Sequence, residues 1–355
     1  MSVLVTGGAG FIGSHTCAEL LDHDYDVVVV DDFSNSYPAA VDALSRLAGR
    51  APAVHDVDLR DTSGLDRVFG AHDISAVIHF AAKKAVGESM TIPLDYFDVN
   101  VGGTISLLRA MRAHGVHRLV FSSSCSIYGD QYRRPIAEDD PPAPVNPYAR
   151  SKLICEQMLE SACGTYADLS VISLRYFNPA GGHQSGLIGE CPRGVPSNVV
   201  PFMVQVAAGK LEKLQVFGGD YDTADGTAIR DYIHVMDVAQ AHRVAVEHLD
   251  DEPGMRALNL GTGTGASVLD LVRTFEQTCG VHVPFAVTGR RPGDVTSLVA
   301  DAGLVHRLWG WRPSRDLAAV FADSWRFQCA NPDGFAGFAG VARSADRPGG
   351  TGAGA

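Results

Sequence analysis

The sequence predicts an α/β fold in which a doubly wound parallel sheet is followed by a smaller, mixed α/β lobe toward the C terminus. Three observations support this prediction. Short apolar runs alternate with amphipathic stretches from the first residue, the runs are nearly continuous in apolar character, and a glycine-rich turn follows the first of them. Continuous apolar runs are typical of parallel strands buried on both faces, and repeated β-α-β units place helices on both sides of such a sheet.

Six runs are the expected strands of the main sheet, and two longer segments have the spacing of helices. The strands are predicted at Val3–Thr6, Asp26–Asp31, Ala53–Val57, Ala76–Ala81, Arg118–Ser124 and Ser170–Phe177, and the helices at Leu94–His114 and Ser151–Ala167. After Phe177 the segment "NPAGGHQSGLIGECPRGVPSNVVP" is rich in Gly, Pro and Ser. That composition predicts a long ordered loop before the second lobe.

Composition restricts the partners of the chain. The 355 residues carry a net charge of −12, which argues against nucleic-acid or anionic-membrane binding but leaves room for a small anionic ligand held by local arginines. Seven scattered cysteines without a Cys-x-x-Cys spacing indicate a reduced chain, and thirteen dispersed histidines indicate no metal site. No signal-peptide pattern and no bilayer-spanning apolar run is found. We therefore expect a cytoplasmic protein that binds no metal.

The first turn has the spacing of a dinucleotide-binding loop. Gly7, Gly10 and Gly13 form Gly-x-x-Gly-x-x-Gly between a strand and a helix, where glycines allow a tight turn and a close approach to a pyrophosphate. Asp31 ends the next strand, 18 residues after Gly13. A carboxylate there binds ribose hydroxyls and repels a 2′-phosphate, so NAD is favoured over NADP. Asp58 is a candidate adenine contact, with the acid at a helix N terminus as the alternative.

Three further residues form a candidate catalytic group. Ser124 ends a predicted strand, and the carboxyl ends of parallel strands face the ligand in this architecture. Tyr148 and Lys152 follow in "VNPYARSK", and their four-residue spacing places them on one helix face. A free tyrosine has a pKa near 10, and we expect the ammonium of Lys152 and the positive nicotinamide to lower it. The group could remove a proton from an alcohol while hydride passes to NAD⁺.

The motifs resemble those of a known family. "TGGAGFIGSHT", "SSSCSIYG" and "YARSK" are similar to the extended short-chain dehydrogenase/reductase superfamily, whose first domain is a Rossmann-type fold. "HFAAKKAVGES", "LRYFNPAGGH", "DGTAIRDYIHVMD" and "RRPGD" resemble the UDP-glucose 4-epimerase family. The resemblance extends from Ser2 to Gln328. It implies interconversion of UDP-glucose and UDP-galactose through a 4-keto sugar, with a tightly bound NAD that is regenerated in each cycle, and a homodimer built on two long helices.

The resemblance also assigns site residues. The expected cofactor contacts are Gly7, Gly10, Phe11, Ile12, Gly13, Asp31, Asp32, Asn35, Ser36, Asp58, Leu59, Phe80, Ala81, Ala82, Lys84, Asn100, Ser124, Tyr148, Lys152 and Phe177. The expected substrate contacts are Lys84, Ser124, Ser126, Tyr148, Asn178, Asn198, Val199, Val216, Phe217, Arg230, Arg291, Asp294 and Leu298. Arginine forks suit phosphate oxygens. His79 and His234 are expected to be packing residues.

Domain boundaries follow from these assignments. We predict an NAD-binding Rossmann-type domain over residues 1–177, to which residues 231–262 return, and a discontinuous substrate lobe over residues 178–330. The Gly/Ala-rich residues 335–355 are expected to form a disordered tail.

Several positions depart from the family pattern and leave alternatives open. Cys125-Ser126 stand where Ala-Thr is frequent, Phe11 replaces a tyrosine, Ala82-Lys83 replace Gly-Leu, and Leu298 is intermediate between the tyrosine and the small residues of relatives. Use of N-acetylated UDP-hexoses and the pathway therefore stay open. The alternatives are a UDP-GlcNAc 4-epimerase, a UDP-glucuronate decarboxylase, a 4,6-dehydratase, or an inactive NAD-binding sensor. Dehydratases carry an Asp-Glu pair where this chain has Cys125-Ser126.

Overall fold

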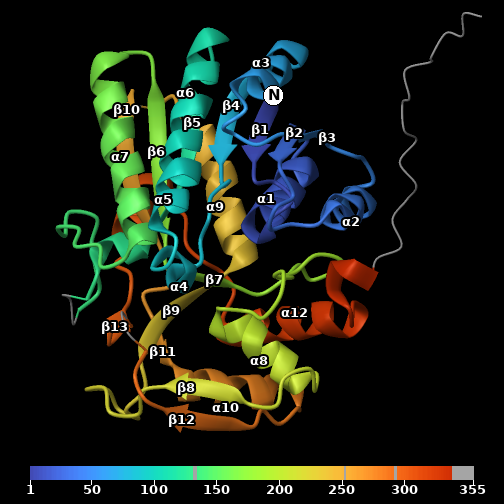
Figure 1. Ribbon diagram of the computed structural model, residues 1–355, viewed down its shortest axis with the longest axis vertical. Helices are drawn as coiled ribbons and strands as arrows, with labels where there is room; N and C mark the ends of the chain where they lie inside the picture. Colours follow the sequence, from blue (N-terminus) through green and yellow to red (C-terminus); the bar gives the residue numbers. More distant parts are fainter. Residues whose placement is uncertain (131–133, 252, 292–293, 338–355) are drawn as a thin grey trace, which may run out of the picture.

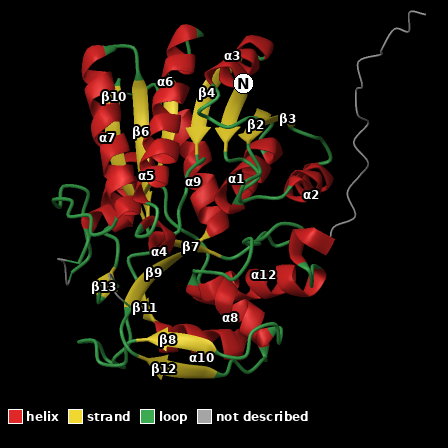
Figure 2. Ribbon diagram, viewed as in Figure 1, coloured by secondary structure: helices red, strands yellow, loops and turns green. Residues whose placement is uncertain are grey.

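The main sheet of the computed structural model has seven parallel strands, with helices on both faces (Figures 1 and 2). The structure describes residues 1–130, 134–251, 253–291 and 294–337. The strand order is β10-β6-β5-β4-β1-β2-β3. The strands are β1 (Ser2–Thr6), β2 (Asp26–Asp31), β3 (Ala53–Asp56), β4 (Ile74–His79), β5 (Arg118–Ser124), β6 (Ser170–Tyr176) and β10 (Gly254–Leu260). The predicted doubly wound fold is confirmed.

Two apolar cores lie on opposite faces of this sheet. One joins the sheet to α1 (Phe11–Asp22), α2 (Pro38–Ala48), α9 (Val235–Glu247) and α11 (Gly303–Trp309). The other joins it to α3 (Thr62–Ala71), α6 (Gly103–Ala113) and α7 (Pro147–Thr165). Because both faces are covered, the strands are apolar throughout, which is why the sequence shows continuous rather than alternating runs.

A second lobe lies beyond the carboxyl ends of the main strands (Figure 1). Its strands are β7 (Asn178–Ala180), β9 (Ile229–His234), β11 (Gly265–Ser267) and β13 (Ser297–Leu298), with the separate pair β8 (Leu214–Phe217) and β12 (Phe285–Thr288). Its helices α8 (Val199–Ala207), α10 (Val268–Cys279) and α12 (Leu317–Ala330) enclose a third core. The chain crosses back to the main sheet through α9 and β10, while the domain limits themselves stay predictions.

The structure differs from the sequence predictions in four segments. The fourth strand ends at His79, so Phe80 and Ala81 lie in the following loop. The segment expected as a loop after Phe177 begins with β7, because residues 178–180 pair with β9, and α8 begins at its end. The helix expected at Leu94–His114 consists of α5 (Pro93–Tyr96), a π-helical segment η1 (Phe97–Gly102) and α6. The helix expected from Ser151 begins earlier, at Pro147, because the side chain of Asn146 caps it.

The C-terminal residues differ from the expected tail at its start. The predicted disordered tail begins at residue 335, yet Phe335 lies in the short helix η3 (Gly334–Gly337) and is 5% exposed. Its ring lies 5.4 Å from that of Phe327. Burial of this ring holds the segment on the protein. Residues 338–355 of the predicted tail lie outside the described residues. The remaining short helices are α4 (Val86–Ser89) and η2 (Cys125–Tyr128).

Candidate active site

The glycine turn between β1 and α1 has the geometry of an anion cradle. Gly7 has a positive φ of 70°, and a Cβ there would lie 2.7 Å from the backbone nitrogen of Ala81. A Cβ on Gly13 would collide with the carbonyl oxygen of Gly7. Gly10 caps α1 without a side-chain bond, and the first turn has no acidic residue. The amides of Phe11, Ile12 and Gly13 therefore begin a helix whose positive dipole end suits a pyrophosphate.

Asp31 ends β2 beside this turn. Its carboxylate accepts hydrogen bonds from the Ala9 amide (2.9 Å), the Phe33 amide (3.0 Å) and the Ser36 hydroxyl (2.7 Å). Burial raises the pKa of Asp31, and these hydrogen bonds oppose that rise. A carboxylate so placed offers its oxygens to ribose hydroxyls and disfavours a second negative charge. Asp32 binds the Ser34 amide, and Asn35 is exposed in the same loop.

Asp58 lies in the turn after β3, where its carboxylate pairs with Arg60. The Arg60 Nε donates to Asp58 Oδ1 at 3.0 Å, and this guanidinium lowers the pKa of Asp58. The alternative of an acid at a helix N terminus is wrong for Asp58, because Asp61 caps α3 and the first turn of that helix has no acidic residue. Leu59, next to Asp58, is buried. Contact of Asp58 and Leu59 with adenine stays a prediction.

Asn100 braces the loop that follows β4. Its amide accepts from the Lys83 nitrogen (2.8 Å) and donates to the Lys83 carbonyl (3.0 Å) and to the Ser151 hydroxyl (2.9 Å). These bonds engage the Asn100 side chain within the protein and connect the loop of Phe80, Ala81 and Ala82 to α7. Contact of Asn100 with the cofactor stays a prediction.

Ser124, Tyr148 and Lys152 come together at the carboxyl end of the main sheet. Tyr148 lies beside Ser124, whose side chain lowers the pKa of the Tyr148 hydroxyl. The Ser124 oxygen also accepts from the hydroxyl of Ser126 (2.9 Å). Lys152 lies one turn after Tyr148 in α7, and its ammonium donates to the Ser122 carbonyl at 2.7 Å. The three residues predicted from the sequence as one group thus meet at the end of β5 and the start of α7.

The electrostatics of this group differ from the sequence-based prediction. Burial raises the pKa of Tyr148 to about 12, with the hydrogen bond to Ser124 as the opposing influence. Burial also lowers the pKa of Lys152 to about 8. The net shift of the Tyr148 pKa is thus upward, opposite to the lowering predicted from the Lys152 ammonium, because burial dominates. The positive nicotinamide is the remaining charge that the prediction named.

The expected substrate residues of the second lobe differ in how far their polar groups are already bonded within the protein. Asn178 carries a buried Oδ1 that has no hydrogen-bond partner among the described residues, and its contact with substrate stays a prediction. Arg230 donates to the Ile229 carbonyl at 2.8 Å, and Arg291 pairs with Asp294 at 3.1 Å and lies 5.2 Å over the Phe217 ring. Two further positions are the helix start Val199 and the buried Leu298, and the expected cofactor contact Phe177 is buried as well.

The predicted substrate contact of Val216 can be made only by its backbone. The side chain of Val216 is fully buried in the core of the second lobe.

Glu190 connects several of these residues and was missed in the sequence analysis. Its carboxylate lies 3.4 Å from Lys84 Nζ and 3.3 Å from Asn198 Nδ2. The Ser122 carbonyl, which holds Lys152, was missed as well. Neither has a signal in the sequence, because its partners are distant along the chain.

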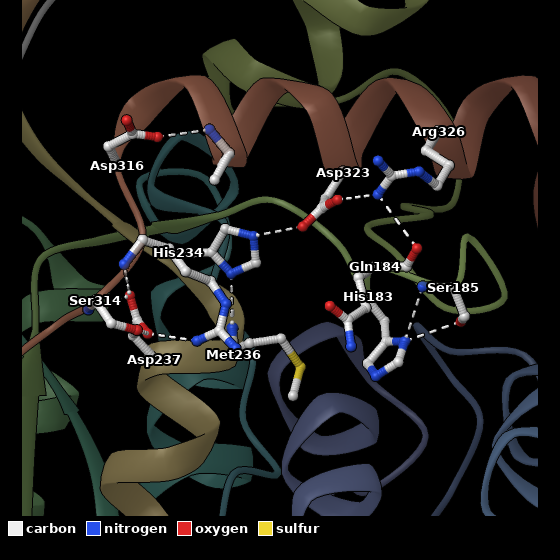
Figure 3. A network of polar contacts seen from close by, with 12 residues as sticks. His183, Gln184, Ser185, His234, Met236, Asp237, Ser314, Asp316, Asp323 and Arg326 are labelled. Atoms are coloured by element: carbon white, nitrogen blue, oxygen red, sulfur yellow. Dashed lines mark hydrogen bonds and ion pairs between the residues drawn. The ribbon is translucent and has the colours of Figure 1, made fainter.

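The two histidines expected to be packing residues are buried and bonded within the protein. His79 lies between the hydroxyls of Thr6 (2.7 Å) and Thr104 (2.9 Å). His234 accepts from the Met236 amide and contacts Asp323 at 3.2 Å (Figure 3). Within the part of the chain that the structure describes, no three His, Cys, Asp or Glu side chains gather as metal ligands. The described helices include none that is long and apolar enough to cross a membrane.

Comparison with known proteins agrees with this geometry. The model of the NAD dependent epimerase/dehydratase family matches residues 3–261, and the chain belongs to that family. Within it, the chain is similar to UDP-glucose 4-epimerases. It is 49% identical to the Bacillus subtilis enzyme over 335 residues, which is 94% of this chain and 99% of the relative.

Two solved structures have the same fold. The UDP-glucose 4-epimerase of Stenotrophomonas maltophila, solved with bound NAD and formylated UDP-arabinopyranose, superposes with a TM-score of 0.91 at 50% identity, covering 94% of this chain and 99% of that one. The Bifidobacterium longum enzyme, solved with NAD⁺ and UDP, has a TM-score of 0.91 at 44% identity and the same coverage of this chain, with 100% of its own.

The buried ammonium of Lys152 predicts a pH dependence of stability. Below pH 8 the lysine is protonated in both folded and unfolded states, and burial of the charge costs folding free energy on the order of 3 kcal/mol. Between about pH 8 and its usual pKa of 10.5, the unfolded state binds more protons, so folding gains stability as pH rises. We expect the free energy of unfolding of the wild type to rise relative to that of Lys152→Met between pH 7 and about pH 10.

Urea unfolding of both proteins at the two pH values measures this change. Lys213→Met, at an exposed lysine, serves as the control, and its difference in unfolding free energy from the wild type should not change with pH. If the difference between the wild type and Lys152→Met is the same at both pH values, the lowered pKa of Lys152 is contradicted.

Proposed function

We propose that this protein interconverts UDP-glucose and UDP-galactose by NAD-dependent epimerisation at sugar C4. The observation that carries the proposal is the bond from Lys152 to the Ser122 carbonyl, which holds α7 with Tyr148 against the strand that ends at Ser124. The glycine turn lies at the carboxyl end of the same sheet. The protein's membership of the epimerase/dehydratase family and its similarity to UDP-glucose 4-epimerases support the substrate class.

Tyr148 is the proposed acid and base. Its hydroxyl takes the proton from the sugar 4-hydroxyl, and Ser124 hydrogen-bonds the same oxygen, so the reacting group is held between two hydroxyls. Because burial raises the pKa of Tyr148 to about 12, the phenol is a poor base until a positive charge lies nearby. NAD, when bound, supplies that charge and accepts and returns the hydride. Lys152 is positioned by Ser122 to meet the nicotinamide ribose.

The second lobe is the proposed anchor. Arg230 and Arg291 would hold the diphosphate, and Asn178 would accept a bond from the substrate through its unpartnered oxygen. An anchor at the nucleotide leaves the hexose free to turn, so that hydride can return to the opposite face of the 4-keto sugar. In this arrangement the anchor and the reacting hydroxyls belong to different lobes. Arg230 lies in β9 of the second lobe, whereas Ser124 ends β5 of the main sheet and Tyr148 begins α7.

Cys125 gives a reason to prefer epimerisation to dehydration. Elimination of water needs carboxylates after the active-site serine, and this chain has a thiol and a hydroxyl there. Burial raises the pKa of the Cys125 thiol to about 12, so it offers no base at neutral pH. The Ser126 hydroxyl bonds Ser124. An inactive NAD-binding sensor would not require the pairing of Tyr148 with Ser124.

Conversion of UDP-galactose without added NAD tests the proposed function. We expect purified protein to form UDP-glucose from its retained cofactor, and Tyr148→Phe to lower turnover by about 10²- to 10⁴-fold, the range of general acid–base catalysis. Chromatography of the nucleotide sugars measures the rate, and extraction of NAD measures cofactor content. Tyr166→Phe, at an exposed tyrosine that ends α7, is the matched control. No interconversion by the wild type would overturn the proposed function.

Leu298 is the proposed determinant of the group tolerated at sugar C2. It is 9% exposed and lies in β13 opposite Arg230 of β9, in a core with Phe177. A leucine there leaves less room than a small residue, so we expect UDP-GlcNAc to react about tenfold or more slowly than UDP-glucose. Leu298→Ser should narrow the ratio of the two kcat/KM values. Equal rates in the wild type would show that this position is not restrictive.

A homodimer through α5, η1, α6 and α7 is the proposed assembly. Leu94 in α5 is 78% exposed and Ile154 in α7 is 39% exposed, an arrangement suited to burial by a second copy. We expect light scattering to give twice the mass of one chain, and Ile154→Glu to shift the population toward monomer. A monomeric wild type at micromolar concentration would contradict this assembly. The seven free cysteines support the cytoplasm as the proposed location.

A further inference from the structure

The loop that carries Asp31 is folded around its own carboxylate. Phe33 adopts a positive φ of 52°, a left-handed conformation that is costly for a residue with a side chain. Its amide and the Ser36 hydroxyl both donate to Asp31 Oδ1. A strained turn of this kind persists only where neighbouring residues hold it.

Arg193 provides that hold from the second lobe. Its Nη2 donates to the Ser36 carbonyl at 2.7 Å and to the Phe33 carbonyl at 3.2 Å, and its Nε donates to the Ser36 carbonyl at 3.2 Å. Its guanidinium also lies 4.6 Å over the ring of Tyr37. In Figure 1 the loop between β7 and α8, which carries Arg193, passes beside α2. A residue 157 positions away thus joins both carbonyls of the strained turn.

The C-terminal segment supports the same contact. The Phe335 amide donates to Sγ of Cys191, two residues before Arg193, at 3.4 Å. The ring of Phe335 lies 6.2 Å from the ring of Tyr37 and is part of the core on that face of the main sheet. Tyr37 therefore contacts both Arg193 and Phe335. Three segments that are distant in sequence meet at the outer edge of the Asp31 loop.

The guanidinium of Arg193 is not part of an ion pair among the described residues. Over the described ranges, no carboxylate lies within 4.0 Å of its guanidinium. Its hydrogen bonds go to peptide carbonyls, for which the planar fork of arginine is suited and lysine is a poorer substitute. Its contacts therefore favour a role in loop geometry.

We propose that Arg193 is a positioning residue that clasps the Asp31–Ser36 loop to the second lobe and slows release of the dinucleotide. The proposal rests on the proposed function, because Asp31 is the expected ligand of the adenine ribose. To leave, the adenosine must part from Asp31, and opening of this loop requires the bonds from Arg193 to break. The clasp acts on cofactor retention and leaves Ser124, Tyr148 and Lys152 unchanged.

Release of NAD from the purified holoenzyme tests the clasp. Arg193→Gln removes the guanidinium, and we expect its NAD dissociation rate to rise about tenfold, with Arg193→Lys intermediate. The rate is measured by diluting the holoenzyme into an NAD-scavenging mixture and following the retained cofactor with time. With saturating NAD, the kcat of both variants should equal that of the wild type, since the reacting residues are untouched.

Arg112→Gln is the matched control, because Arg112 is an exposed arginine that stacks 3.7 Å over the ring of Tyr166, at the C-terminal ends of α6 and α7. Its release rate should equal that of the wild type. A wild-type release rate in Arg193→Gln would overturn the clasp, as would full recovery in Arg193→Lys, which would indicate simple charge attraction. The two proposals can fail separately. If the wild type retains NAD and converts UDP-galactose, but Arg193→Gln releases NAD at the wild-type rate, only the clasp is contradicted and the proposed function is unaffected.

Discussion

The bond from the Lys152 ammonium to the Ser122 carbonyl is the interaction on which the candidate site depends. A buried cation is stable only where its donors are satisfied, and the end of β5 supplies a carbonyl at 2.7 Å. This bond fixes α7 against β5. It thereby sets the position of Tyr148 relative to Ser124, which lies two residues after Ser122 in the same strand. The lowered pKa of Lys152 shows that burial of the charge is costly to the fold. A site that accepts such a cost is typical of catalytic groups, where function and stability compete.

The two lobes divide the proposed work between rigid and adaptable parts. The parallel sheet places the glycine turn after β1, Asp31 at the end of β2 and Ser124 at the end of β5, all at its carboxyl edge. The second lobe is built from short strands and loops, and it supplies the arginines, Asn178 and Leu298. Arg193 and Glu190 belong to one loop of the second lobe and contact residues from both ligand regions. That loop joins cofactor and substrate regions through backbone and side-chain contacts.

The site also shows how burial outweighs a neighbouring charge. An ammonium one helical turn from a phenol suggests an activated tyrosine, yet burial raises the pKa of Tyr148 to about 12. Removal of water disfavours the charged phenolate, and this effect dominates the pKa of Tyr148. In the proposed mechanism the positive nicotinamide is the charge that would oppose it.

The doubly wound sheet, the glycine turn, Asp31 and the group of Ser124, Tyr148 and Lys152 could be predicted from local signals. These signals are continuous apolar runs, turn-forming glycines and a four-residue spacing within one helix. Other features emerged from the folded chain alone: residues 178–180 form a strand on β9, Phe335 is buried, Asp61 and not Asp58 caps α3, and Arg193 reaches Ser36. Each of the long-range contacts joins segments separated by tens to hundreds of residues, and burial and the pKa values that follow from it depend on those neighbours rather than on local spacing.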